Sequence, residues 1–374
     1  GRDEHRIRAL DAYMAALGLS GPEHDPANYA NLLFNVGEGY MLVDQPQAAY
    51  DYYRRAMRAG FSFVGAHGEA ALRQIGRSAM ASGDYEFAAG LLGRALAMQR
   101  DSARDAGETV PLLRRRAETL DRLSLAYHLD GDYGRAVEHY GRYAEAVEAL
   151  VEEDPRAAAG YRRNLLRAHR NLAVNLYLAV QEGQAEPARL TEAYDLLKEA
   201  VERLAAVGVI EWEEAKGPGL ITVDIEVALG RKKGPAGFDA DAEKRLLYTY
   251  MGRLSAAAGN YAEAVRYLTG KVELYPELPA DTDQTDVLTE QAVVWSQIGA
   301  YEMARAKAAA AARAYRRAAA LEERAGNLEG AAAAAVSFGR AVLHLAAQAE
   351  PPADLEVLAA EAIQTHRRLL GSIR

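Results

Sequence analysis

The chain has 374 residues, more than one hydrophobic core usually organises, so several domains or a stacked array of small units is expected. It contains no cysteine, which excludes disulfides, thiolate metal sites and cysteine nucleophiles and fits a reducing compartment. A net charge of −9 argues against nucleic acid as a partner, and no apolar run approaches the roughly 20 residues that a membrane span needs. We therefore expect a cytoplasmic protein that binds neither nucleic acid nor membrane.

Residues 1–29 are predicted to form an N-terminal capping helix followed by a break. The apolar residues Ile7, Leu10, Met14 and Leu17 recur at helical spacing. The stretch "GLSGPEHDP" that follows contains the glycine and proline residues that interrupt helices. The first repeated unit is therefore expected to start near residue 30.

A short turn motif recurs along the chain. In Gly131-Asp132-Tyr133, the glycine can take the left-handed conformation that ends a helix, and the aspartate can accept hydrogen bonds from the free amides of the next helix. The same order occurs at Gly83-Asp84-Tyr85 and Gly259-Asn260-Tyr261 and, in weaker form, at Gly299-Ala300-Tyr301 and Gly326-Asn327-Leu328. This recurrence predicts a series of helix–turn–helix units.

We expect four such units in residues 30–207 and three more in residues 242–347. Each pairs a small residue on its first helix with a small residue early in its second, so that the two backbones can approach while larger side chains fill the space beside them. The clearest sets are Leu33, Gly37 and Tyr40 with Ala49, Tyr53 and Ala56; Leu72, Gly76 and Ala79 with Ala88, Leu92 and Ala95; Leu120, Ser124 and Tyr127 with Ala136 and Tyr140; and Tyr248 and Gly252 with Ala264 and Leu268.

These residues resemble the signature of the tetratricopeptide repeat (TPR). The resemblance implies an all-α protein, an α-solenoid of about seven TPR-like units, and by analogy a role in binding other proteins. The turns are roughly forty residues apart, against about thirty-four in the ordinary repeat, which predicts lengthened helices. Such repeats are similar to those of kinesin light chains and of bacterial arrays that precede a caspase-like CHAT domain.

Two further segments depart from the repeat. In residues 208–241 the helical period fails, and Ile221, Val223, Ile225 and Val227 alternate with polar residues between glycine and proline breaks. This pattern predicts a non-helical or β-hairpin-like insertion. Residues 348–374 are predicted to hold a C-terminal capping helix with apolar residues on one side.

The candidate binding residues lie on the first helices, which line the concave groove in the TPR family. Arginine forks suit carboxylates, and side-chain amides suit the backbone of an extended peptide. The expected exposed groove residues of these types are Asn35, Arg73, Arg77, Arg122, Arg170, Asn171 and Asn175. The groove is thus predicted to bind an acidic or C-terminal segment of a protein, although the arginines could instead pair with neighbouring carboxylates on a solvated helix face.

Asparagines form a second pattern. Asn164, Asn171 and Asn175 lie within about twenty degrees of one line on a helix. Since asparagine is a poor helix former, this stripe needs an explanation. Either it clamps peptide backbone, or it bonds to neighbouring helices or to water.

No residue pattern indicates catalysis. The histidines form no HExxH or other close ligand pair, and His128, His139 and His169 are expected at the boundary or surface. The stretch "GRKKGPAG" lacks the order of a phosphate-binding loop. We expect no enzyme, metal, cofactor or small-molecule ligand. The leading hypothesis is a scaffold that binds protein or peptide, and the alternative is a regulatory or sensor arm of a larger effector such as a TPR-linked CHAT protease.

Overall fold

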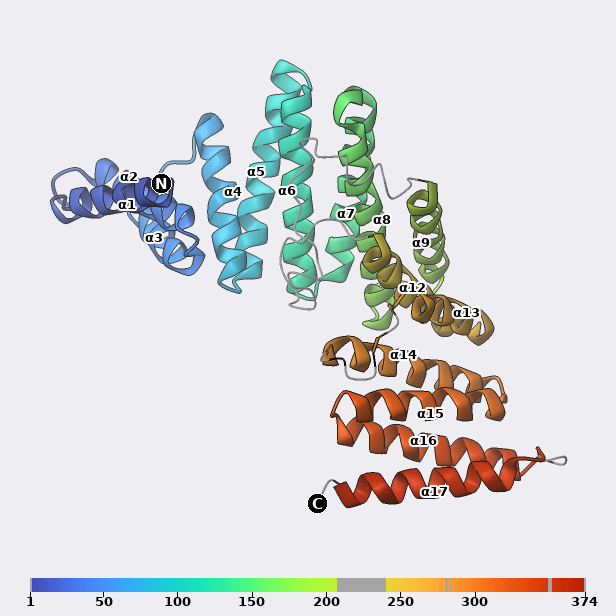
Figure 1. The fold of residues 1–374 in the computed structure, drawn as a ribbon. Helices are drawn as coiled ribbons and strands as arrows, with labels where there is room; N and C mark the ends of the chain where they lie inside the picture. Colours follow the sequence, from blue (N-terminus) through green and yellow to red (C-terminus); the bar gives the residue numbers. More distant parts are fainter. Residues whose placement is uncertain are drawn as a thin grey trace. The chain divides into compact units, whose positions relative to one another are not determined.

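The computed structural model describes residues 2–206, 240–276, 278–279, 282, 284–348 and 352–372 (Figure 1). Throughout these residues the regular structure is helical, with 15 α-helices, one short 3-10 helix and no strand. The chain divides into two compact units, which we call unit 1 (residues 2–189) and unit 2 (residues 190–206 and 240–372). This division separates the two helices of the predicted fourth repeat.

Unit 1 is a stack of antiparallel helices in which neighbours in sequence pack together. Its hairpins are α2 with α3, α4 with α5 and α6 with α7, while α1 packs on α2 and α8 packs on α7. The bounds are α1 Arg2–Gly18, α2 Pro26–Leu42, α3 Pro46–Arg58, α4 Gly65–Ala81, α5 Tyr85–Ala106, α6 Val110–Leu129, α7 Tyr133–Glu153, the 3-10 helix Pro155–Ala157 and α8 Ala158–Gln181.

Unit 2 repeats this arrangement. Helix α12 packs on α13, and α14 to α17 lie one above the next in Figure 1. The bounds are α9 Arg189–Ala206, α12 Ala240–Ala257, α13 Tyr261–Glu273, α14 Thr285–Ala304, α15 Ala308–Arg324, α16 Leu328–Ala346 and α17 Leu355–Ser372. The predicted insertion, residues 208–241, lies outside the described residues except for 240 and 241, which begin α12.

The glycine turns end helices as predicted. Gly83, Gly131, Gly259 and Gly326 have φ values of 78°, 81°, 76° and 75°, the left-handed region that favours glycine. In the turn that joins α6 to α7, the Asp132 carboxylate accepts a hydrogen bond of 3.0 Å from the backbone N–H of Arg135. Asn260 and Asn327 cap α13 and α16 in the same way.

Small residues on the first helices hold each hairpin together. A Cβ atom added at Gly37 would come within 2.5 Å of the Tyr53 ring, and one added at Gly76 within 2.9 Å of Leu92. The pairs Gly252 with Leu268 and Gly299 with Tyr315 repeat this contact at the same sequence separation. The hairpins are therefore TPR-like in their packing, and the prediction of an all-α solenoid is confirmed.

One predicted turn is wrong. Gly299-Ala300-Tyr301 lies inside α14, and the chain turns instead at residues 305–307, where Ala306 has a φ of 58°. Gly299 is buried against Tyr315 and serves as the small packing residue of its hairpin. A glycine with an aromatic residue two positions later is compatible with a turn and with a close contact between helices, so the local sequence does not distinguish the two.

Candidate ligand-binding face

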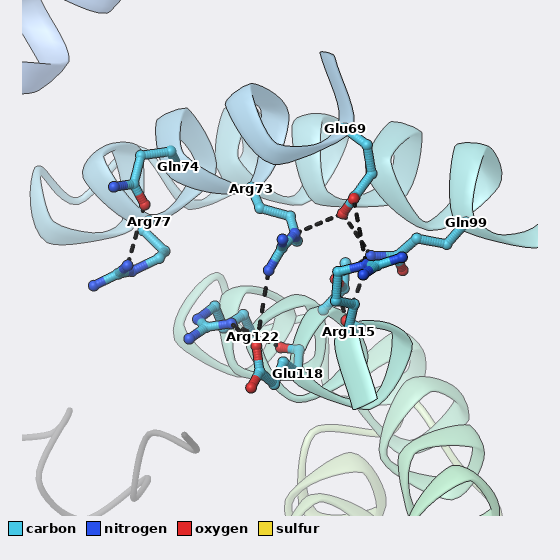
Figure 2. Close-up of polar contacts among 9 residues, drawn as sticks. Glu69, Arg73, Gln74, Arg77, Gln99, Arg115, Glu118 and Arg122 are labelled. Carbon is cyan, nitrogen blue, oxygen red and sulfur yellow. Dashed lines mark hydrogen bonds and ion pairs between the residues drawn. The ribbon is translucent and has the colours of Figure 1, made fainter. Parts of the chain in front are cut away.

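A polar network joins the first helices α4 and α6 in unit 1 (Figure 2). We call it the first-helix network; its connected members are Glu69, Arg73, Gln99, Arg115, Glu118, Thr119 and Arg122, and we include in it the separate Gln74–Arg77 pair on α4, whose charge acts on Arg122. At one end, Glu69 accepts hydrogen bonds from Arg73 Nε at 2.6 Å and from Gln99 Nε2 at 2.7 Å. Gln99 Nε2 also donates to Thr119 Oγ1 at 3.0 Å, so α5 contributes to the same cluster.

Glu118 links arginines from two helices. Its Oε2 lies 3.7 Å from Arg73 Nη1, which reaches across from α4, and 3.9 Å from Arg122 Nη1 on α6 (Figure 2). Arg122 also donates to the Glu118 carbonyl at 3.3 Å. Arg73 and Arg122 are therefore held in place by a shared carboxylate.

Arg77 differs from the other arginines in the network. It is exposed, and it donates to the neutral Gln74 Oε1 at 3.1 Å. Among the described residues, no carboxylate lies within ion-pair distance of its guanidinium. Burial lowers the pKa of Arg122, and the positive charges of Arg77 and Arg73 lower it further, against the opposing effect of Asp121 and Glu118. This part of the face thus holds crowded positive charge.

The structure brings together three of the predicted binding residues and leaves one apart. Arg73, Arg77 and Arg122 belong to the first-helix network. Asn35 lies half-buried on α2, and no hydrogen bond joins it to the network in the described chain. Glu69, Gln99, Arg115 and Glu118 were not predicted, although Arg115, Glu118 and Arg122 share one stripe of α6 by spacing.

Arg122 of the network and the three predicted residues on α8 are buried, so the expectation that these four residues are exposed is wrong. The exposed fractions are 5% for Arg122, 0% for Arg170, 2% for Asn171 and 0% for Asn175. Arg170 donates from Nε and Nη2 to Asn171 Oδ1 at 3.2 and 3.0 Å. Asn175 donates from Nδ2 to the Asn171 carbonyl at 2.7 Å. A role for these α8 residues in binding a ligand stays a prediction.

The asparagine stripe makes a contact between helices. Asn175 Oδ1 on α8 lies 2.9 Å from His128 Nδ1 on α6, and both side chains are buried. Asn164 is buried as well. Of the two interpretations of the stripe, bonding to a neighbouring helix is the one observed for Asn175. His128 on α6 is therefore an interior residue, contrary to the expectation of a boundary or surface position. The sequence could not show which faces of α6 and α8 turn inward.

Two other findings bear on the kind of site. Within the part of the chain that the structure describes, no three or more acidic or histidine side chains come together to hold a metal ion. None of the described helices is both long enough and apolar enough to cross a bilayer.

No protein-family model and no curated protein sequence matches the chain. Solved structures do resemble it. They include TPR proteins. A putative kinesin light chain of Podosopora anserina with nearly identical TPR-like repeats is 16% identical, with a TM-score of 0.42, and the match covers 69% of this chain and 95% of that one.

Two further structures are similar at comparable levels. BtubC (BKLC) from P. vanneervenii is 12% identical, with a TM-score of 0.42 and coverage of 77% of this chain and 92% of that chain. A signal-transduction ATPase with numerous domains and a TPR sensor, from Pyrococcus horikoshii, is 12% identical, with a TM-score of 0.41 and coverage of 96% and 49%. All three TM-scores are below 0.5.

Proposed function

We propose that the first-helix network of unit 1 binds an acidic or C-terminal segment of a partner protein. The observation that carries this proposal is the position of Arg77, an exposed guanidinium beside Arg73 and Arg122 with no carboxylate at contact distance in the described structure. A ligand carboxylate placed there would relieve the repulsion among the arginines and match the planar fork of Arg77.

The paired arginines have a different role in this proposal. Arg73 and Arg122 are oriented by Glu118, and Glu69 also holds Arg73. Their geometry is fixed before a ligand arrives, which lowers the entropic cost of binding. Arg77 supplies the direct contact, and the paired arginines supply a positive field around it.

The proposal is tested with short fluorescein-labelled peptides followed by fluorescence anisotropy. One peptide is rich in Asp and Glu and has a free C-terminal carboxylate; the others are its C-terminally amidated form and a form with Lys in place of the acidic residues. We expect the acidic peptides to bind and the Lys-rich peptide not to bind. Arg77→Glu should weaken binding roughly tenfold or more, because an attraction becomes a repulsion.

The matched control is Arg58→Glu on α3, an exposed arginine outside the network. It makes the same change in net charge and should leave peptide affinity within about twofold of the parent protein. If Arg77→Glu and Arg58→Glu lost the same amount of peptide affinity, the loss would be an effect of net charge, which would contradict the proposed site. Failure of every acidic peptide to bind would contradict the ligand class.

A further inference from the structure

A second site in unit 1 lies between α5, α6 and α7. The three helices line a half-open pocket of about 520 Å³, within the range typical of small-molecule sites. Its apolar lining comprises Leu96, Ala97, Leu120, Leu123 and Ala146, of which all but Ala97 are buried beneath the polar side chains. The pocket shares no residue with the first-helix network, since the α6 residues that line it fall on a different stripe of that helix.

Positive charge gathers at this pocket. Each helix contributes one arginine to the lining: Arg100 from α5, Arg116 from α6 and Arg142 from α7. Glu145 is the one carboxylate among the lining residues. The lining therefore carries two more positive than negative charges if histidine is neutral.

The three arginines differ in their partners. Arg116 Nη1 pairs with Glu108 at 2.5 Å, and Arg142 Nη1 lies 4.0 Å from Glu138. Arg100 is exposed and has no hydrogen bond or ion pair within the described chain. Arg100 is thus available to an incoming anion without breaking a contact.

An aromatic pair completes the lining. The rings of Tyr127 and His139 are stacked, with centroids 5.3 Å apart and an interplanar angle of 6°. Burial lowers the pKa of His139, and Arg142 and Arg135 lower it further against the effect of Glu138. The imidazole is therefore neutral near pH 7, and the stacked pair borders the arginines of the lining.

We propose that this pocket binds a small phosphomonoester whose organic part rests on the leucine floor. A phosphate monoester carries about −1.5 to −2 charges at neutral pH. Arg100 offers it a guanidinium without an ion-pair partner in the described chain, and Arg116 and Arg142, which also pair with Glu108 and Glu138, lie on the same lining. Guanidinium groups bind phosphate oxygens with paired hydrogen bonds. Contact with the apolar lining residues stabilises binding of the attached organic group. The sequence predicts no small-molecule ligand, and the proposal departs from that prediction.

Gly93 provides a direct way to test the pocket. It lines the pocket on α5, and a Cβ atom built there would meet no atom within 4 Å. The Cβ atom of Gly93→Leu has room, the rest of the leucine side chain should take up space in the half-open pocket, and leucine is the better helix former, so the variant should fold. The control is Gly141→Leu on α7. A Cβ atom built at Gly141 also meets no atom within 4 Å, and Gly141 does not line the pocket.

The experiment is calorimetric titration at low ionic strength with phenyl phosphate, inorganic phosphate and benzoate as probes. We expect phenyl phosphate to bind roughly tenfold more tightly than either of the others, because only it combines the dianion with an apolar group. Gly93→Leu should abolish this binding, and Arg100→Ala should weaken it roughly tenfold. Gly141→Leu and Arg58→Ala should leave it unchanged.

The proposal would be overturned by no saturable binding of phenyl phosphate up to about 5 mM, by equal affinity for phenyl phosphate and inorganic phosphate, or by equal binding of phenyl phosphate to the two leucine variants. Stronger binding of benzoate than of phenyl phosphate would replace phosphate by carboxylate and also contradict it. Arg77→Glu should not change the affinity for phenyl phosphate, so the titration with phenyl phosphate tests this pocket independently of the peptide site.

Discussion

At the scale of single residues, glycine has two opposite roles in this chain. Gly37 is buried in the middle of α2, and a Cβ atom there would come within 2.5 Å of Tyr53. The Tyr53 ring is fully buried, and its hydroxyl donates to Glu38 Oε1 at 2.5 Å, so it has little freedom to move. Gly141 in α7 faces open space.

This contrast predicts opposite effects of one substitution. Gly37→Ala should lower the free energy of unfolding by about 1–3 kcal/mol, because overpacking outweighs the gain in helix propensity. Gly141→Ala should raise it by about 0.5–1 kcal/mol, because only the propensity changes. Urea denaturation followed by circular dichroism measures both. Stabilisation by Gly37→Ala would show that the hairpin tolerates the extra methyl group and would refute the packing argument.

At the scale of helices, a polar contact fixes the corner between α7 and α8. The Asp154 carboxylate, at the end of α7, pairs with Arg114 Nη2 of α6 at 2.6 Å and accepts a hydrogen bond from the Tyr161 hydroxyl of α8 at 3.1 Å. The hydrogen bond from Arg114 lowers the pKa of Asp154 below its ordinary value of 3.8, and the bond from Tyr161 adds to this effect. The contact therefore depends on the ionised carboxylate.

The lowered pKa predicts how this corner responds to pH. Because the carboxyl group has a lower pKa in the folded than in the unfolded chain, the unfolded chain binds more protons as the pH falls through this range. The stabilisation by Asp154 is complete above its unfolded pKa and is lost as the pH falls through its folded pKa. Asp154→Asn should thus lower the urea midpoint at pH 7, and the difference from the parent protein should shrink below about pH 4. A difference that is constant from pH 7 to pH 3 would contradict the role of the charge.

Particular residues show what the sequence could predict at this scale. The turn glycines and the small packing residues are local signals, so the hairpins of both units follow from them. Gly299 shows the limit, since its role depends on Tyr315 in the next helix. The positions of the candidate binding residues depend on more distant packing. Asn175 contacts His128 on another helix, and Arg100, Arg116 and Arg142 line one pocket only because three long helices stack. Side-chain type predicts the chemistry of these residues, but not which face of a helix is buried.

At the scale of the whole molecule, stability is distributed along the chain. The extensive helix contacts among the described residues join helices that follow one another in sequence. In unit 1, one cluster of buried side chains continues from Leu92 through Leu120 and Tyr140 to Tyr161. In unit 2, separate clusters include Leu268 with Ile298, and Phe338 with Val342. Each hairpin is thus stabilised mainly by its neighbours, as in other repeat proteins.

This distribution predicts a local response to a local defect. In Gly37→Ala, hydrogen exchange measured by mass spectrometry should speed up in α2 and α3 and in the adjacent α1 and α4, because these helices share packing with the altered hairpin. Exchange in α14 to α17 should stay within error of the parent protein, since their contacts lie among themselves and with α13. Gly141→Ala is the control that should speed up exchange nowhere. A uniform loss of protection through α17 would instead mean that the array unfolds as a single cooperative body, and the nearest-neighbour description would then be wrong.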